Sequence, residues 1–316
     1  MQKRIKFFGS ALGIFVCYFY YGILQERITR GKYGGKNGEE EEKFVYALSL
    51  VLVQCVINFI FARLMLSYIM PQGEDTTKSV YYSLSALMYF LAMVASNMAL
   101  QWVNYPTQVV AKSCKPIPVM VLGVLIGRKS YIWRKYLFVI LIVLGVTLFM
   151  LKEGKSRATS ENGLGVGELL LLSSLMMDGL LGAIQERMKA EHETRSGHMM
   201  LGLNKWSTLY LSVAVIATGE IVEFWKFVGR HPAVLWQLGS LAAAGAFGQY
   251  FILFVVSEFG PLPSSIVTTT RKFFTVLGSV ILFGNTLVLR EWAGTTLVFT
   301  GLFLDALYGK SPSKKK

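Results

Sequence analysis

The sequence is short of charged residues. Only 16% of its 316 residues are Asp, Glu, Lys or Arg, whereas 53% are hydrophobic. A soluble domain of this length needs a more polar surface, so this composition excludes an ordinary soluble protein and favours one that lies in a lipid bilayer. The chain also lacks a long polar segment, since its longest polar connections are 26–43, 152–164 and 187–203. These are too short for an independent catalytic domain, so the function must reside in the membrane part.

Cysteine and nucleotide-hydrolysis motifs are also scarce. The three cysteines, Cys17, Cys55 and Cys114, all fall in apolar runs, which indicates small buried side chains rather than a disulfide framework or a metal site. Two Gly-Lys-Ser tripeptides, at 154–156 and 309–311, lack the earlier glycine of a P-loop. We therefore predict no enzyme activity, no catalytic residues, no bound metal and no cofactor.

Acidic residues are outnumbered by basic ones, and the net charge is +13. Such a charge is typical of nucleic-acid-binding proteins when the cations form a stripe on a polar face. Here the cations lie in short loops, in the C-terminal tail and at four positions inside apolar runs. This distribution argues against a nucleic-acid partner.

Runs of about 20 mostly apolar residues, the length that crosses a bilayer as a helix, recur along the chain. The first begins with basic residues, as a signal peptide does, but it has no small-residue cleavage site and is expected to be retained. Lys and Arg are more frequent in the loops on the side of the termini, which predicts that both termini are cytosolic. We predict an all-α polytopic membrane protein with ten transmembrane helices, at 5–25, 44–66, 80–102, 106–126, 134–151, 165–186, 204–225, 232–257, 262–284 and 290–308.

Short matches suggest that the chain contains an internal repeat. Gln-Glu-Arg ends the first predicted span at 25–27 and the sixth at 185–187, and Pro106 and Pro261 open the fourth and ninth spans, each followed by Val-Leu-Gly at the same distance. A repeat of five spans crosses the membrane an odd number of times and therefore ends on the other side. Its second copy then enters the membrane from the opposite side, as in many secondary transporters. The alternative is a chance match in a glycine-rich apolar sequence. The predicted parts are a first repeat at 1–151, a second at 165–308 and a basic cytosolic tail at 309–316.

Four cations lie inside predicted spans. Lys112 and Lys115 are three residues apart in the fourth span, and Arg271 and Lys272 are adjacent in the ninth. Each charge costs roughly 2.5–3.5 kcal/mol at the bilayer centre, so such side chains must face a water-filled cavity or an anion. The alternative left open is pairing with a carboxylate of the bundle, such as Glu26 or Asp178. Because Arg and Lys bind phosphate oxygens well, we predict that the four cations bind substrate phosphates.

Other polar residues lie close to these cations in the predicted spans. Prolines at 106, 116 and 118 are expected to break or bend the fourth helix and to free backbone groups for a ligand. The tyrosines of the first span are suited to stacking on a substrate base. An aromatic belt at the membrane interface explains them equally well. The candidates for contact with a substrate base or sugar, or for gating, are Tyr21, Gln25, Glu26, Gln108 and Thr270.

Three segments carry a resemblance to a known family. Residues 16–26 (VCYFYYGILQE), 104–120 (NYPTQVVAKSCKPIPVM) and 268–274 (TTTRKFF) closely resemble the nucleotide-sugar transporters of solute carrier family 35, subfamily B, within the drug/metabolite transporter superfamily. The resemblance covers nearly the whole chain and is closest to an endoplasmic reticulum branch. It implies ten spans, cytosolic termini, antiport, and contact of Lys112, Lys115, Arg271 and Lys272 with substrate phosphates.

Taken with the buried cations, the resemblance predicts an antiporter of the endoplasmic reticulum membrane that imports ATP in exchange for ADP. Import of UDP-galactose or UDP-glucose in exchange for a nucleoside monophosphate is the alternative. A membrane enzyme acting on lipid-linked phosphates would need a carboxylate pair at suitable spacing, and a structural scaffold would need no buried cations. The tail at 314–316 is basic but departs from the di-lysine retrieval spacing of relatives. The expected partners are the nucleotide solute and the bilayer, and the sequence leaves the oligomeric state open.

Overall fold

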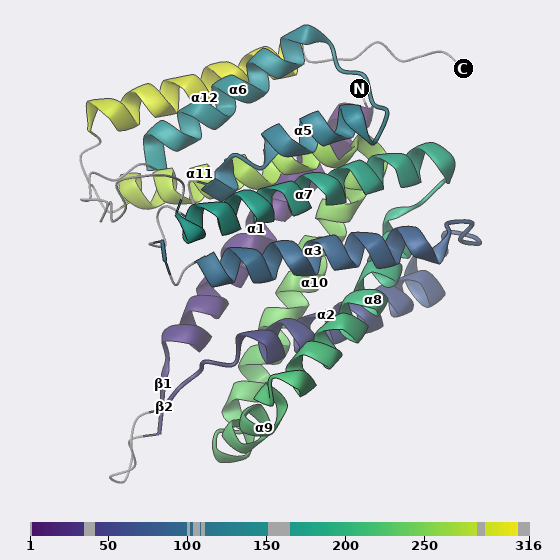
Figure 1. Cartoon of the computed structure of the whole chain (residues 1–316), viewed down its shortest axis with the longest axis vertical. Helices are drawn as coiled ribbons and strands as arrows, with labels where there is room; N and C mark the ends of the chain where they lie inside the picture. The colour runs from purple at the N-terminus through teal and green to yellow at the C-terminus, as the bar shows by residue number, and fades with distance from the viewer. Residues whose placement is uncertain are drawn as a thin grey trace. The chain divides into compact units, whose positions relative to one another are not determined.

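The computed structural model describes residues 2–34, 42–99, 102–103, 108, 111–150, 165–282 and 288–308. Almost all of these residues are helical (Figure 1). A pair of two-residue antiparallel strands follows the first helix. In chain order the elements are α1 (Gln2–Arg30), β1 (Lys32–Tyr33), β2 (Glu42–Lys43), α2 (Ala47–Leu64), the π-helical η1 (Met65–Ile69), α3 (Ser79–Ala99), α5 (Pro116–Leu125), α6 (Trp133–Met150), α7 (Val166–Glu191), α8 (Ser196–Ala217), α9 (Glu220–Arg230), α10 (Ala233–Phe259), α11 (Pro261–Leu282) and α12 (Leu289–Tyr308).

Eight of the ten predicted spans coincide with a helix that begins within a few residues of the expected position, namely α1, α2, α3, α6, α7, α10, α11 and α12. Five segments of the described helices are long and apolar enough to cross a membrane: Lys3–Gln25, Ala47–Ile69, Ser79–Ala99, Val166–Glu191 and Ala233–Phe259. The all-α membrane class is therefore confirmed. The number of ten spans and the inverted repeat stay predictions.

The seventh predicted span, 204–225, has the wrong boundaries. The helix there begins earlier, at Ser196, and ends at Ala217, and α9 follows after a turn at Gly219. Gly219 has a φ of 72°, a left-handed conformation that glycine adopts without steric cost. Glu220 and Glu223 occupy the first turn of α9, where the positive end of the helix dipole favours acidic side chains. The polar residues after Ala217 therefore end one helix and start the next.

The fourth predicted span, 106–126, is interrupted where its prolines predict. Residues 111–113 are helical, a turn follows at Cys114 and Lys115, and α5 begins with Pro116. Proline has no backbone N–H to donate within a helix and is favoured at the first helical position. This break places Lys115 at the N-terminal cap of α5 rather than inside a continuous helix.

The first compact unit comprises Met1–Phe90 and His192–Glu258. Within it, α2 packs along α8 (Figure 1). Aromatic rings join the strand pair to α9, since Tyr33 and Phe44 both stack edge-on against Phe227. Arg230 of α9 also pairs with Glu42 at 3.1 Å. The buried hydrophobic cluster of this unit consists of Ile28, Phe44, Leu50, Phe224, Phe227, Val228, Val234, Leu238 and Leu241.

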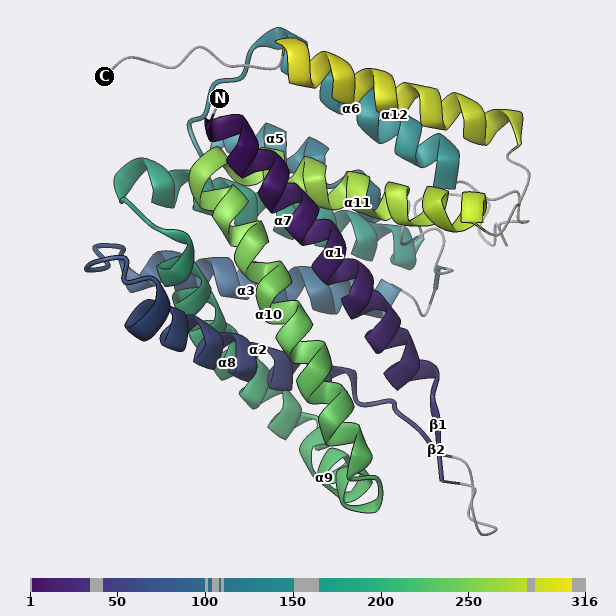
Figure 2. The same ribbon diagram turned by 180° about the vertical axis from the view of Figure 1, so that it is seen from behind.

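The second compact unit comprises Leu91–Glu191 and Phe259–Lys316. Here α6 lies along α12, and α5 lies along α7 (Figures 1 and 2). Glycine permits the close approach of α6 and α12, because a Cβ at Gly145 would meet the carbonyl oxygen of Gly294 at 2.7 Å. Lys135 of α6 also pairs with Asp305 of α12. The buried hydrophobic cluster of this unit consists of Val119, Met120, Val139, Ile142, Val143, Val146, Phe149, Leu262, Ile266, Phe273 and Val298.

Each compact unit takes helices from both halves of the sequence. The α2–α8 pair joins the second and seventh predicted spans, and the α6–α12 pair joins the fifth and tenth. In a repeat of five spans, these partners occupy equivalent positions in the two halves. The pairing agrees with the predicted repeats at 1–151 and 165–308, which remain a prediction.

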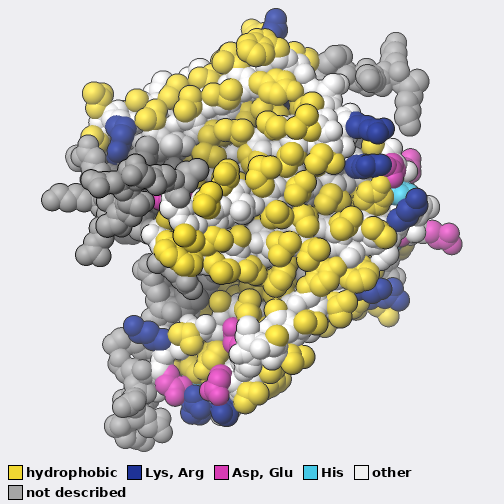
Figure 3. Space-filling view, in the orientation of Figure 1, with side chains coloured by type: hydrophobic (Ala, Val, Ile, Leu, Met, Phe, Trp, Pro, Cys, Tyr) yellow, Lys and Arg dark blue, Asp and Glu magenta, His cyan; other side chains and the backbone are white. Residues whose placement is uncertain are grey.

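Hydrophobic side chains face outward on several helices. One face of α1 exposes six large apolar side chains at helical spacing: Ile5, Phe8, Leu12, Val16, Phe19 and Ile23. Hydrophobic side chains cover most of the visible surface over α3, α5 and α7, and charged ones gather toward the helix ends (Figure 3). A large contiguous apolar surface is unfavourable in water, so the pattern indicates that these faces contact lipid.

Candidate functional site

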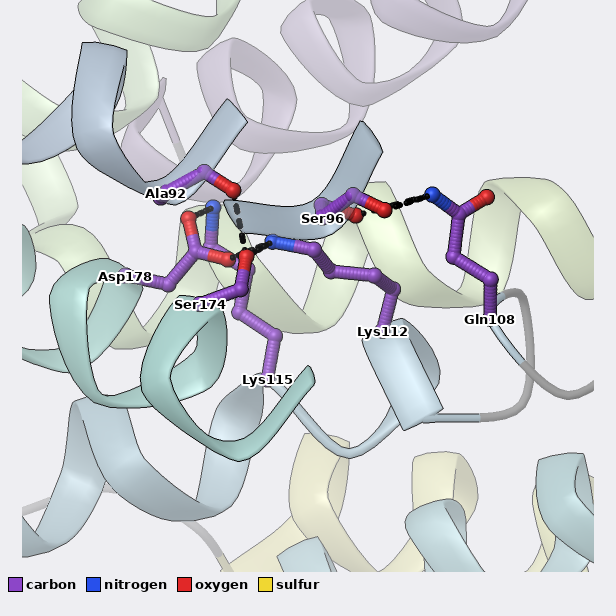
Figure 4. Close-up of polar contacts among 7 residues, drawn as sticks. All are labelled: Ala92, Ser96, Gln108, Lys112, Lys115, Ser174 and Asp178. Carbon is purple, nitrogen blue, oxygen red and sulfur yellow. Dashed lines mark hydrogen bonds and ion pairs between the residues drawn. The ribbon is translucent and has the colours of Figure 1, made fainter. Parts of the chain in front are cut away.

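Two lysines from the interrupted fourth span meet one carboxylate of α7. The Nζ of Lys112 lies 2.8 Å from Oδ2 of Asp178, and the Nζ of Lys115 lies 2.9 Å from Oδ1 (Figure 4). Each carboxylate oxygen thus takes one ammonium group. The two lysines, three residues apart in the sequence, thus meet at one carboxylate, although the turn at 114–115 means that they do not share one regular helix.

A serine on α7 gives Lys112 a second partner. Ser174 precedes Asp178 by one helical turn, so both side chains lie on the same face of α7. The Nζ of Lys112 donates to Oγ of Ser174 at 2.5 Å, and this hydroxyl donates to the backbone carbonyl of Ala92 in α3. The contacts therefore join α3, the 111–115 segment and α7 (Figure 4).

Small residues allow the close approach that these contacts require. A Cβ at Gly179, next to Asp178, would lie 2.8 Å from Leu122 Cδ1 and 2.9 Å from the carbonyl oxygen of Pro118. Glycine at this position lets α7 lie directly against α5, which begins one residue after Lys115. The Asp-Gly pair thus supplies both the anion and the space for its partners.

The cluster of Lys112, Lys115 and Asp178 has one positive charge more than it has negative charge. The side chain of Asp178 is 6% exposed, whereas those of Lys112 and Lys115 are 18% and 30% exposed. Pairing with Asp178, one of the alternatives that the sequence left open, is therefore present. One carboxylate cannot balance two ammonium groups, and the remaining positive charge can attract an anion.

The other candidates differ in their surroundings. Gln108 is buried, and its Nε2 donates to the carbonyl oxygen of Ser96 at 2.6 Å and to its hydroxyl at 3.0 Å. Thr270 is buried on α11 and donates to carbonyl oxygens of its own helix, at Ile266 and Val267. These bonds hold both polar side chains within the second compact unit.

Tyr21 and Gln25 lie on α1, in the first compact unit. The hydroxyl of Tyr21 donates to Oε1 of Gln54 on α2 at 2.9 Å, and Gln25 is exposed. Arg271 is partly buried on α11, a helix that packs against α5 and α7. The side chains of Glu26 and Lys272 lie outside the described residues. Contact of these residues with a substrate stays a prediction.

Sequence reasoning named Asp178 as a possible partner of the cations but did not include it, or Ser174, among the site residues. The available signal was an isolated carboxylate in the middle of the apolar run 169–184, with a serine four residues earlier on the same helix face. In the described part of the chain, no group of three or more His, Cys, Asp or Glu side chains could hold a metal ion.

A second buried carboxylate lies at the end of α7. Glu186 is 6% exposed and lies 3.3 Å from the Nζ of Lys129, which is in the connection between α5 and α6. A Cβ at Gly260, before α11, would meet Oε1 of Glu186 at 2.8 Å. Burial, together with this nearby carboxylate, raises the pKa of Tyr131. Glu186 belongs to the second Gln-Glu-Arg match, and it joins the ends of α5, α7 and α11.

Comparisons with known proteins agree with the membrane setting. The model of the UAA transporter family matches residues 6–309. The chain is 55% identical to the Solute carrier family 35 member B1 homolog of Drosophila melanogaster over 314 residues, covering 98% of this chain and 92% of that protein. It is 53% identical to Solute carrier family 35 member B1 of Danio rerio (99% and 95% covered) and of Bos taurus (99% and 97% covered).

Proposed function

The chain belongs to the UAA transporter family, and from this premise we propose that it exchanges ATP for ADP across the endoplasmic reticulum membrane. Family membership makes it a membrane transporter and not an enzyme. The choice of ATP and ADP rests on the resemblance of residues 104–120 and 268–274 to the endoplasmic reticulum branch. The observation that supports a phosphate-bearing solute is that two partly buried lysines, Lys112 and Lys115, share a single buried carboxylate.

The charge of this cluster suits an anionic solute. In a protein interior surrounded by lipid, a net positive charge is unfavourable unless an anion or water approaches it. A phosphate group provides several oxygens that an ammonium group binds well, and Lys side chains are long enough to follow a moving ligand. In this proposal, Arg271 and Lys272 contribute further contacts from α11.

The net positive charge of this cluster also favours exchange over one-way transport. An empty carrier would have to pass through its closed state with a net positive cluster, whereas a carrier that holds nucleotide passes through with its charge compensated. Reorientation is therefore faster with a nucleotide bound in either direction. Asp178 lowers the cost of the empty state but does not remove it, because it balances one of the two lysines.

The test is counterflow with purified protein in liposomes. Labelled ATP should enter vesicles preloaded with ADP and should enter empty vesicles far more slowly. Lys115→Gln should abolish this uptake without preventing membrane insertion. The control is Lys226→Gln, which removes an exposed lysine that is also paired with a carboxylate, at 2.9 Å from Glu223. Equal uptake into empty vesicles would refute exchange, and wild-type uptake by Lys115→Gln would refute the site.

The same vesicles can decide between the two nucleotide classes. Unlabelled ATP, ADP, UDP-galactose, UDP-glucose and UMP are added in turn as competitors of labelled ATP uptake. The proposal predicts that ATP and ADP compete most strongly. Uptake of labelled UDP-galactose against UMP, with no response to ATP, would instead assign a nucleotide sugar as the solute.

Location in the endoplasmic reticulum is part of the proposal and rests on the same resemblance. A tagged chain should coincide with a reticulum marker by fluorescence microscopy. A steady-state location at the Golgi or the plasma membrane would contradict this part of the proposal and leave the transport assay unaffected.

A further inference from the structure

Asp178 occupies the position at the lysine pair that an anionic ligand would be expected to take. It lies in the middle of α7, is buried, and offers one oxygen to each lysine at 2.8 and 2.9 Å. Two ammonium groups that converge on two oxygens of one anion form the same donor arrangement that a phosphate group would use. The carboxylate thus holds both ammonium groups of the lysine pair (Figure 4).

The two lysines are held unequally. Lys112 has a second acceptor in Ser174, and that hydroxyl is itself fixed by the carbonyl of Ala92. Lys115 has the more exposed side chain, at 30% against 18%, and it lies in the turn at which the helix breaks. An approaching anion can therefore reach Lys115 while Lys112 stays bound to α7.

We propose that Asp178 is a resident counter-ion that competes with the substrate phosphate for Lys115. This inference rests on the proposed function, since it concerns the same lysines. In the empty carrier, Asp178 binds both ammonium groups. When a nucleotide arrives, its phosphate oxygens take Lys115, and Asp178 keeps its pair with Lys112. When the nucleotide leaves, the carboxylate returns to Lys115 and thereby assists release.

A different role for Asp178 would be a purely structural clamp that holds the 111–115 segment against α7. The two roles predict opposite effects of Asp178→Asn. A clamp is needed to form the site, so its loss weakens nucleotide binding. A competitor lowers affinity, so its loss strengthens binding. Removing one negative charge also increases attraction in proportion to the charge of the ligand, so the gain should rise from AMP to ADP to ATP.

The experiment measures dissociation constants for AMP, ADP and ATP with purified full-length protein, and exchange rates in liposomes. Asp178→Asn should bind ATP about tenfold more tightly, a change of about 1.4 kcal/mol, with a smaller gain for AMP. Its KM for ATP should fall, and its maximal exchange rate should fall too because release becomes slower. Glu168→Gln removes the same charge from the exposed first turn of the same helix and should show no graded gain.

A second comparison holds even if Asp178→Asn alone proves unstable because two unbalanced lysines repel each other. Lys112→Gln leaves Lys115 with Asp178, whereas Lys112→Gln combined with Asp178→Asn leaves Lys115 without a competing carboxylate. The double variant should bind ATP more tightly than Lys112→Gln alone.

The outcomes separate the inference from the proposed function. If wild-type protein binds nucleotides and removal of Asp178 leaves binding unchanged or weaker in both backgrounds, the counter-ion role is refuted and the function stands. If wild-type protein binds none of the nucleotides, the proposed function fails and takes the inference with it. A graded gain from AMP to ATP supports both.

Discussion

Ser174 shows how a single neutral side chain can position a charged one. Its hydroxyl accepts from Lys112 in a partly buried bond and donates to the carbonyl of Ala92 in a buried one. Ser174→Ala removes both bonds and leaves a lysine with one acceptor fewer. Buried hydrogen bonds contribute about 1 kcal/mol each, more where a charged group takes part. We therefore expect a lower midpoint of thermal unfolding in detergent, by a few degrees.

The neighbouring residue provides the control for this measurement. Ser173→Ala removes an exposed hydroxyl from the same helix and should leave the unfolding midpoint unchanged. If the two variants unfold at the same temperature, the Ser174 bonds contribute nothing measurable to stability.

At this scale the sequence predicted the cations better than their partners. Lys112 and Lys115 stand out because a charge inside an apolar run is unfavourable, and their spacing places them close together. The partner was harder to identify because several carboxylates lie in or near the spans. Only the packing of α7 on α5, allowed by Gly179, decides in favour of Asp178.

A side chain at Gly260, the residue between α10 and α11, is unfavourable for two reasons. Gly260 precedes α11 with a φ of 103°, and an added Cβ would lie 2.8 Å from Oε1 of Glu186. Gly260→Ala therefore imposes a left-handed conformation on a residue with a side chain, at about 1–2 kcal/mol. It also displaces the carboxylate that pairs with Lys129. We expect a clear fall in the unfolding midpoint, measured on purified protein.

A second glycine serves as the matched substitution. Gly239 lies inside α10, and an added Cβ would meet no atom within 4 Å. Because Ala favours a helix interior over Gly by about 1 kcal/mol, Gly239→Ala should be neutral or stabilising. A Gly260→Ala protein as stable as Gly239→Ala would show that the α10–α11 connection relaxes without cost.

Helix positions could be predicted where apolar runs end in prolines, glycines or charges. Pro116 and Pro261 mark the first residues of α5 and α11. The seventh span was placed wrongly because Ile221, Val222 and Phe224 continue an apolar-rich pattern past the true helix end at Ala217. A hydropathy pattern averages over such a turn, whereas the left-handed conformation of Gly219 separates the two helices.

On the scale of the whole molecule, the arrangement of charge and hydrophobicity is the reverse of that in a soluble protein. Large apolar side chains line the exposed face of α1, and ion pairs such as Lys112–Asp178 and Lys135–Asp305 lie inside. Composition alone predicted this class. The compact units could not be predicted from it, because each is built from helices of both sequence halves.

The ten-span topology makes a prediction about which side of the membrane each connection faces. Lys129 follows the fourth predicted span, and Lys226 lies in α9 between the seventh and eighth; both side chains are exposed. Three spans separate these positions, so they must lie on opposite sides. In a chain whose three native cysteines are replaced by Ala, Lys129→Cys should react with an impermeant thiol reagent added to the cytosolic side. Lys226→Cys should react only after the membrane is permeabilised.

This pair of positions tests the parity of the spans and the orientation at once. The excess of Lys and Arg on the side of the termini predicts that the connection at 127–132 is cytosolic, and the parity of the spans then fixes α9 on the luminal side. Labelling of both variants from the same side would mean an even number of crossings between them and would exclude the ten-span order. If Lys129→Cys reacted from the luminal side and Lys226→Cys from the cytosolic side, the ten-span order would stand but the whole chain would have the opposite orientation. The Glu186–Lys129 contact would then face the lumen rather than the cytosol.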